Sequence, residues 1–257
     1  MKKLIAVLLL VLILLPNSVR SAETRPQFVQ KVYASVALLY KQTEDGGMKM
    51  TCTATAYKKL DKDAGYRFVS ASHCVSGETD QEQKASKYFI TFDTTGEKTF
   101  IPASLVMAGD RKVGDDFSIF EVKTAAKLET VPLGDSDKLT IGDAVVNVAS
   151  PLGLGKQFFQ GYISDTVVDR PPLDAGDVQW KDVILVAIGG GPGSSGSSIV
   201  SEDQRAIIGF LVGSFGEGSN IGHIVVPVSK FKKFETAVDN HTYKKTPPKS
   251  ESLKSLF

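Results

Sequence analysis

Short β-favouring segments follow one another along most of this 257-residue chain. Each is rich in Val, Ile, Thr, Phe or Tyr and is bounded by Gly, Asp, Lys or Pro, which is typical of strands joined by turns. No long amphipathic helical pattern separates them, which argues against a parallel α/β sheet and favours all-β barrels or sandwiches. We expect strands at residues 32–40, 51–57, 66–72, 88–92, 100–107 and 116–122, and a second set at 144–148, 158–168, 183–188, 198–200, 206–212 and 223–228.

One segment near the C-terminus has helical spacing instead. Phe231, Phe234 and Val238 recur at i, i+3 and i+7, so we expect a helix over residues 229–238. A possible helix over residues 26–31 is too short to assign. The tail at residues 239–257 is polar and basic, and we expect it to be disordered.

The first 22 residues are organised as a secretory signal peptide. Lys2 and Lys3 precede an unbroken apolar run at residues 4–15, and the small residues Ser21 and Ala22 follow it. A transmembrane helix needs roughly 20 apolar residues, so we expect no stable membrane anchor after cleavage. The sequence therefore predicts a secreted or periplasmic protein.

Charge gives no reason to expect a polyanionic partner. Removing residues 1–22 removes Lys2, Lys3 and Arg20 and changes the formal net charge from +1 to −2. A domain so close to neutral has no electrostatic preference for nucleic acid or an anionic membrane. Neither is therefore expected as a partner.

A glycine-rich segment, G-G-G-P-G-S-S-G-S-S at residues 189–198, delivers a serine into a strand. A serine hydroxyl is a weak nucleophile that needs a nearby base and donors for the developing oxyanion. Glycines let backbone N–H groups turn into one pocket, and those of Gly193 and Ser195 are the candidates. A flexible Gly/Ser loop is the alternative, whereas a phosphate-binding loop lacks its lysine.

Candidates for the base and its partner lie upstream of this serine. His73 ends an apolar strand, whereas His223 opens a strand and His241 lies in the tail. Asp116 begins an apolar strand and can accept an imidazole N–H, and its neighbour Asp115 points to the other face of a regular strand. The chain order His, Asp, Ser belongs to a nucleophilic hydrolase and excludes the α/β-hydrolase order, in which Ser comes first.

The chain has two cysteines, Cys52 and Cys74, on strand-like segments. In an oxidising compartment they are expected to form a disulfide, with two separate buried thiols as the alternative. Together with three histidines they show none of the close spacings of a metal site, so no metal and no cofactor is expected.

At these residues the sequence resembles the trypsin-like (chymotrypsin-fold) serine peptidases. It is nearer the bacterial HtrA/Deg-type and glutamyl-endopeptidase branches, and we see no appended PDZ domain. The similar motifs are S-A-S-H-C at 70–74 (family T-A-A-H-C), D-F-S-I-F at 116–120 (D-I-A-L-L), G-S-S-G-S at 193–197 (G-D-S-G-G or G-N-S-G-S), A-S-P-L-G at 149–153 with G-Y-I-S at 161–164, and S-F-G at 214–216 (S-W-G).

This resemblance implies two six-stranded antiparallel β-barrels, with the active site between them. The N-terminal barrel would occupy residues 23–128, and the C-terminal barrel with its closing helix residues 129–238. It implies that Ser195 attacks a peptide carbonyl, that His73 takes and returns the proton, and that Asp116 orients His73.

The resemblance also implies the residues that contact substrate. Backbone N–H groups of Gly193 and Ser195 would form the oxyanion hole. The other substrate-binding residues would be Gly189, Ser214, Phe215 and Gly216. No Asp stands in this region to hold Arg or Lys, so a small or medium apolar side chain is expected before the cleaved bond.

Two departures from the family pattern bear on function. Ser194 replaces the Asp of zymogen-type members, so we predict no activation by insertion of a new N-terminus. The extra glycines at 189–191 leave open whether the oxyanion hole is formed at rest. An inactive binding module on the same fold is therefore the alternative to a peptidase, and an esterase would share the triad. With no peptide-binding domain, we expect a monomer that acts on polypeptides.

Overall fold

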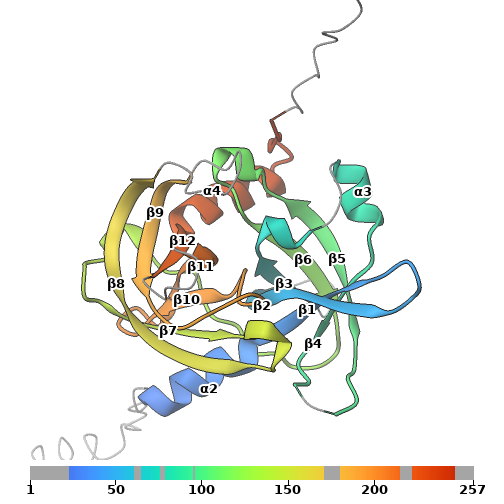
Figure 1. Cartoon of the computed structure of the whole chain (residues 1–257), viewed down its shortest axis with the longest axis horizontal. Coiled ribbons are helices and arrows are strands. Elements are labelled where there is room, and N and C mark those ends of the chain that lie inside the picture. The colour runs from blue at the N-terminus through green and yellow to red at the C-terminus, as the bar shows by residue number, and fades with distance from the viewer. Residues whose placement is uncertain are drawn as a thin grey trace, which may run out of the picture.

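Twelve strands, divided by the turns expected from sequence, form two closed six-stranded antiparallel barrels that lie side by side (Figure 1). The computed structural model describes residues 23–60, 65–75, 79–94, 96–170, 180–214 and 222–246. The predicted all-β class and the two-barrel architecture are confirmed. The predicted signal peptide at residues 1–22 lies outside the described residues.

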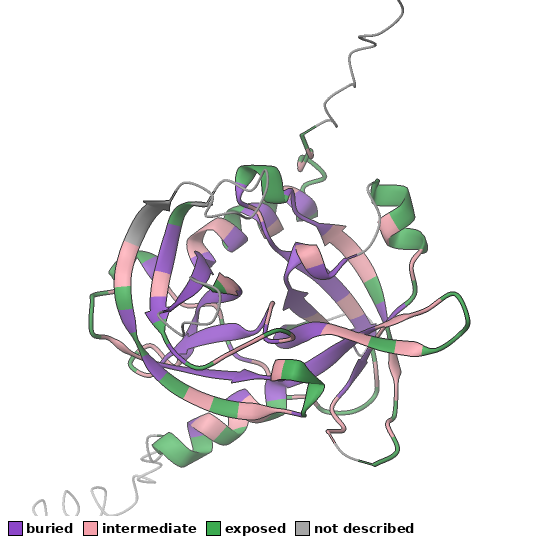
Figure 2. Cartoon of the chain, in the orientation of Figure 1, coloured by how far each residue is buried: buried purple, intermediate pink, exposed green. Residues whose placement is uncertain are grey.

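The first barrel has the strand order β1-β2-β3-β6-β5-β4. Its buried side chains include Val, Ile, Leu, Phe, Ala and Tyr, and buried residues follow the strands of both barrels (Figure 2). The strands are β1 (Val36–Gln42), β2 (Met48–Leu60), β3 (Gly65–Ser70), β4 (Tyr88–Thr91), β5 (Ile101–Ala108) and β6 (Ser118–Lys123).

The second barrel repeats this closed arrangement, in the order β10-β11-β12-β9-β8-β7. Register shifts in β8 and β11 bend the strands, as closure of a small barrel requires. The strands are β7 (Ala144–Ala149), β8 (Gln157–Arg170), β9 (Trp180–Ala187), β10 (Ser198–Ser201), β11 (Ala206–Ser214) and β12 (His223–Pro227).

An N-terminal helix, α2 (Arg25–Ser35), precedes the first strand and corrects the strand expected at 32–40. Thr24 and Gln27 form a capping box, and proline stands in the first turn, so helix-starting signals override the β-branched residues that follow. Arg25 pairs with Glu202 at 2.7 Å, which ties this helix to the second barrel.

The predicted C-terminal helix is present as α4 (Val228–Asp239) and packs against both barrels. The ring of Phe231 contacts Phe117 from the first barrel at 5.4 Å and Phe210 from the second at 5.0 Å, measured between ring centroids. All three rings are fully buried. This aromatic cluster joins the two barrels into one core.

The chain after α4 differs from the disorder expected for residues 239–257. Asp239 ends the helix, and His241 adopts a left-handed conformation (φ 56°) that reverses the chain. The N–H groups of His241 and Thr242 bond to the carbonyls of Val238 and Ala237, the pattern of a Schellman motif. Residues 240–246 therefore follow a defined path, and residues 247–257 lie outside the described part.

A short helix, α3 (Asp80–Ala85), was not expected from sequence; Thr79 and Glu82 give it a capping box. In the described part of the chain, no helix is long and apolar enough to cross a bilayer.

Candidate active site

His73 and Asp116 form a direct hydrogen bond between two neighbouring strand ends of the first barrel. His73 lies in the single helical turn η1 (Ser72–Cys74) after β3, and Asp116 lies just before β6. The imidazole Nδ1 is 2.8 Å from Asp116 Oδ2. Because a carboxylate only accepts, Nδ1 is the donor of this bond, and Nε2 is the ring nitrogen that remains for proton transfer.

Three further groups hold the Asp116 carboxylate, which is fully buried. Its Oδ1 accepts hydrogen bonds from Ser72 Oγ at 2.8 Å and from the His73 backbone N–H at 2.9 Å. Arg111 Nε lies 3.6 Å from Oδ2. Burial on its own would raise the pKa of Asp116, but the hydrogen bonds and charges of His73, with Arg111, outweigh it and hold the pKa below its usual value.

The serine segment begins with a tight turn from Gly191 to Ser194. The Ser194 N–H bonds to the Gly191 carbonyl at 2.9 Å, and Gly193 has φ +96°, as a type II turn requires at its third residue. A Cβ on Gly193 would lie 2.6 Å from the Ser150 carbonyl oxygen. Only glycine fits this position.

Backbone N–H groups in this loop fall into two sets. In the first set, the Gly191 N–H donates to Ser194 Oγ, and the Ser194 N–H donates to the Gly191 carbonyl. The Gly196 N–H donates to the Leu211 carbonyl, and the Ser197 N–H donates to the Ser194 carbonyl. Within the described residues, the N–H groups of Gly193 and Ser195 donate to no protein acceptor. Two neighbouring unengaged donors are what an oxyanion hole needs.

The orientation of the Gly193 N–H is set from the short helical turn η4 (Pro151–Gly153). The Leu152 N–H donates to the Pro192 carbonyl at 2.6 Å. In a trans peptide the carbonyl and the following N–H point in opposite directions, so the Gly193 N–H points away from η4. This contact holds the Pro192–Gly193 peptide in one orientation.

Contacts between the barrels place the loop that carries Ser195 beside the end of the first barrel that carries His73. The Thr53 N–H donates to the Ser195 carbonyl at 3.0 Å, and the Thr53 hydroxyl donates to the Gly193 carbonyl at 2.8 Å. A Cβ on Gly196 would lie 2.6 Å from the backbone nitrogen of Ala71, two residues before His73. No hydrogen bond joins Ser195 Oγ to His73 in the described structure; such bonds are often long in an enzyme without substrate.

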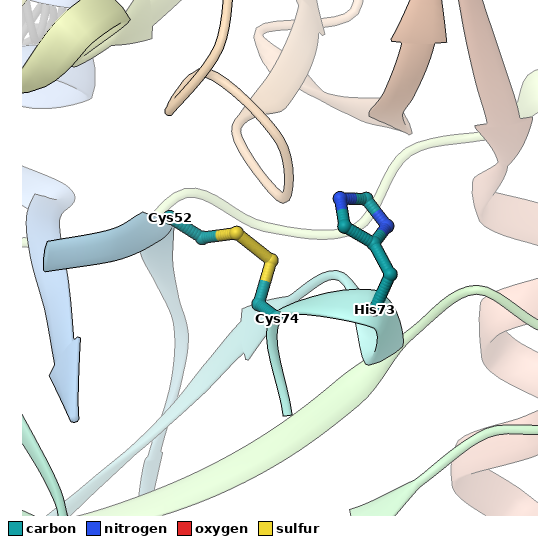
Figure 3. A group of neighbouring side chains, drawn as sticks. All are labelled: Cys52, His73 and Cys74. Atoms are coloured by element: carbon teal, nitrogen blue, oxygen red, sulfur yellow. A yellow bond between two sulfur atoms is a disulfide. The ribbon is translucent and has the colours of Figure 1, made fainter. Parts of the chain in front are cut away.

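The predicted disulfide between Cys52 and Cys74 is present. It joins Cys52 of β2 to Cys74 of η1, and Figure 3 shows it on the same short turn that carries the His73 imidazole. Both sulfurs and a ring nitrogen of His73 lie within 4.8 Å of one another, which is compact enough for a metal ion. The sulfurs are bonded to each other and offer no thiolate, so this group fixes the strand behind His73 rather than forming a metal site.

The region predicted to receive the substrate side chain is only partly described. Gly189 packs on the Phe159 ring, Ser214 ends β11, and Phe215 and Gly216 lie outside the described residues. His223 is buried beside Gly190, and its Nδ1 has no hydrogen-bond partner among the described residues. Burial lowers the pKa of His223, so its ring is neutral at neutral pH and adds no charge here.

A surface hollow of about 880 Å³ lies elsewhere, between the β1–β2 hairpin and residues 85–87. Lys41, Lys49 and Lys87 are among its lining residues, and His73, Asp116 and Ser195 are not. The candidate active site is therefore defined by its hydrogen bonds and not by this hollow.

Sequence reasoning missed three residues that support the site. Ser72 donates to Asp116, Thr53 holds the serine loop, and the Leu152 N–H fixes the Pro192 carbonyl. Ser72 stands inside the S-A-S-H-C motif, but an isolated serine gives no sign of its partner. The Leu152 N–H could not be predicted to donate, because every residue except proline has a backbone N–H. The P-L-G stretch indicated only that a turn lies there.

The fold and this arrangement of His73, Asp116 and the serine loop define a trypsin-like peptidase domain. Residues 53–209 match the trypsin-like peptidase domain family, and the chain belongs to that family. A stretch of 62 residues is 34% identical to the periplasmic pH-dependent serine endoprotease DegQ of Escherichia coli (strain K12), covering 24% of this chain and 13% of DegQ.

Solved structures with the same fold include HtrA-type proteases. The chain matches the HtrA-type protease AlgW with tripeptide at a TM-score of 0.65 and 21% identity, over 85% of this chain and 64% of AlgW. It matches Deg5 at 0.62 and 15% identity, over 86% of this chain and 95% of Deg5. The chain thus spans less than two thirds of that AlgW structure, and its match to DegQ covers a small part of DegQ.

Proposed function

We propose that this protein is a secreted or periplasmic serine endopeptidase that cleaves polypeptides through an acyl-enzyme on Ser195. The observation that supports this most is the pair of unengaged N–H groups at Gly193 and Ser195, on a loop packed against the strand end that carries His73. The family supports a serine peptidase, and the signal-like residues 1–22 support export.

The catalytic cycle assigns one role to each residue. Ser195 Oγ attacks the peptide carbonyl carbon while His73 Nε2 takes the hydroxyl proton, and the tetrahedral oxyanion lies between the N–H groups of Gly193 and Ser195. The C–N bond then breaks, and His73 gives the proton to the leaving amine. Water, activated by His73, hydrolyses the acyl-enzyme. Asp116 holds Nδ1–H throughout and stabilises the imidazolium.

Activation by N-terminal insertion is not needed in this mechanism. Ser194 Oγ accepts the Gly191 N–H at 3.1 Å and so bridges the turn from within. In zymogen-type members the equivalent Asp awaits a new N-terminus; Ser194 already has its partner. We propose that the mature chain is active as exported.

For specificity, we retain the expectation of a small or medium apolar side chain before the cleaved bond. Gly189, Gly190 and a neutral His223 provide no fixed charge in the described part of this region. Profiling with a peptide library tests this. A preference for Glu or Arg above about tenfold, or roughly 1.4 kcal/mol, would overturn it.

The function is tested by hydrolysis of an unfolded protein such as casein, with wild type, Ser195→Ala and the control Ser164→Ala. Ser164 is an exposed serine on β8. We expect Ser164→Ala to match wild type and Ser195→Ala to lose about 10⁶-fold in kcat. Equal activity of wild type and Ser195→Ala would refute the proposal, and a folded wild type that cleaves nothing would favour the binding module.

A further inference from the structure

The segment that follows α4 is packed on the loop that carries Asp116. Between Gly109 and Phe117 the chain forms a compact loop, closed by Gly109 N–H to Phe117 carbonyl at 2.7 Å and Asp115 N–H to Asp110 carbonyl at 3.0 Å. A Cβ on Gly109 would lie 2.2 Å from the Asp115 carbonyl oxygen. The loop is therefore tightly closed at its base, directly before Asp116.

Tyr243 reaches the two ends of this loop with one hydroxyl group. Its Oη accepts the Asp110 backbone N–H at 2.8 Å and donates to Asp115 Oδ2 at 3.1 Å. Burial, and then the neighbouring Asp115 carboxylate, raise the pKa of Tyr243 well above its usual value. The hydroxyl therefore stays protonated and both hydrogen bonds persist at neutral pH.

Contacts on either side fix the segment that carries Tyr243. The Tyr243 ring packs edge-on against Phe234 of α4, with centroids 4.7 Å apart. The Thr246 N–H donates to Asp110 Oδ2 at 2.8 Å, and Lys245 Nζ lies 2.5 Å from Asp80 Oδ1 at the start of α3. Residues 240–246, named here the C-terminal strap, are thus held at several points by charged and aromatic partners.

Asp115 and Asp116 are each hydrogen-bonded to a different part of the molecule. Asp115 bonds to the strap through Tyr243, and Asp116 bonds to His73. The two residues are adjacent in the chain and each is held by a different partner, so a rotation of this dipeptide that moved Asp116 off His73 would also pull Asp115 off Tyr243. The hydroxyl of Tyr243 opposes that rotation.

We propose that the C-terminal strap positions the carboxylate of the catalytic aspartate, and that Tyr243 is the positioning residue through which it acts. This rests on the proposed function in assigning catalysis to Asp116. Tyr243 touches no reacting atom; it keeps Asp116 at hydrogen-bonding distance from His73. Misplacing a catalytic group by about 1 Å can cost up to about 10²-fold in rate.

The test replaces Tyr243 by Phe, which keeps the ring on Phe234 and removes the hydroxyl. Tyr33→Phe is the matched control, because Tyr33 lies on α2, far along the chain from the strap, and among the described residues its Oη bonds only to the Lys156 carbonyl. We expect Tyr243→Phe to lower kcat and the rate of fluorophosphonate labelling about tenfold, with KM unchanged. An unchanged kcat, or a raised KM with unchanged kcat, would overturn the proposal.

A double variant shows whether Tyr243 acts through Asp116. Residues that act through one another have non-additive effects. In an Asp116→Asn background, Tyr243→Phe should therefore change the labelling rate no further. The same tenfold loss in that background would mean a general structural role and would overturn the proposal.

A spectroscopic measurement separates the strap from the peptidase function. The proton of the His73–Asp116 hydrogen bond is expected as a downfield imidazole resonance, assigned by its loss in His73→Ala. Tyr243→Phe should shift or broaden it, whereas Tyr33→Phe should not. If wild type reacts with no probe but this shift occurs, the peptidase proposal fails and the strap stands; an unmoved resonance overturns the strap.

Discussion

Asp115 and Asp116 are neighbours in the sequence, yet their surroundings move their pKa values in opposite directions. Burial raises the pKa of both carboxyls. For Asp116, hydrogen bonds and charge from His73 reverse this effect, whereas for Asp115 the bond from Tyr243 does not overcome burial and the nearby charge of Asp110. At the residue scale, the opposite directions of the two pKa shifts are therefore set by the hydrogen-bonding and charged partners of each carboxylate, since burial acts in the same direction on both.

Replacing Asp116 by Asn is expected to lower kcat about 10⁴-fold with little change in KM. The amide oxygen can still accept from Ser72 and the His73 N–H, which turns its NH₂ toward Nδ1. The imidazole must then carry its proton on Nε2, where it cannot accept from Ser195. Steady-state kinetics check this against Asp137→Asn, at an exposed site in the second barrel. A loss below about tenfold would contradict the assigned role.

The raised pKa of Asp115 leads to a prediction about how the free energy of unfolding depends on pH. Because its folded pKa is raised, its protonated form favours folding at low pH, and this contribution is lost as pH rises through the folded pKa. Asp115→Asn cannot titrate, so its free energy of unfolding should rise relative to wild type between pH 4 and pH 7. Urea unfolding at both values measures the difference, and a constant difference would contradict the prediction.

Sequence alone points to His73, Asp116 and Ser195 as candidates, because each stands in a local pattern: a strand end, a strand start and a glycine-rich turn. It was not sufficient for Thr53 or Tyr243. Their roles depend on partners 140 and 128 residues away along the chain, and nothing local marks such a partner.

At the scale of elements, the short turn η4 controls the serine loop. Leu152 is 70% exposed and has φ 55°, a left-handed conformation that a side chain disfavours. Its contribution to the site is the backbone N–H that holds the Pro192 carbonyl. The element therefore acts through its backbone shape.

Two substitutions at Leu152 separate backbone shape from side chain. Leu152→Gly keeps the N–H and relieves the left-handed strain, so we expect unchanged kcat and a gain of about 1 kcal/mol in the free energy of unfolding. Leu152→Pro removes the N–H and forbids positive φ, so the Pro192–Gly193 peptide loses its anchor and kcat should fall at least tenfold. Equal kcat for the two variants would contradict the role of η4.

Two segments were misjudged from the sequence, the helix α2 and the chain after α4. The T-R-P-Q stretch at residues 24–27 contains the capping box and the proline of α2, yet the β-branched residues after it favoured a strand. The tail was judged by its polar composition, whereas Tyr243 finds Phe234 and Asp110 in the folded protein. Local helix-start signals decided the first case, and tertiary contacts that composition does not show decided the second.

At the scale of the molecule, the two barrels share one aromatic cluster directly beside Asp116. Phe117, the residue after Asp116, packs on Phe210 of the second barrel and Phe231 of α4. The two-barrel fold followed from the strand pattern and the family motifs. The cluster that couples the barrels did not, because it depends on how α4 docks.

Phe231→Ala is expected to destabilise the protein by about 3–5 kcal/mol, because it empties a fully buried site at the junction of the barrels. If the cluster couples the barrels, unfolding of the wild type followed by circular dichroism and by fluorescence should coincide in one transition. A loss below about 1 kcal/mol would show that the barrels do not depend on this contact.

The most direct test of the whole account is mass spectrometry of the mature protein after reaction with a fluorophosphonate probe. We expect a single adduct on Ser195, absent from Ser195→Ala and formed much more slowly in Asp116→Asn, because only an activated serine beside an oxyanion hole reacts. A folded protein that forms no adduct, or one modified at another serine, would contradict it.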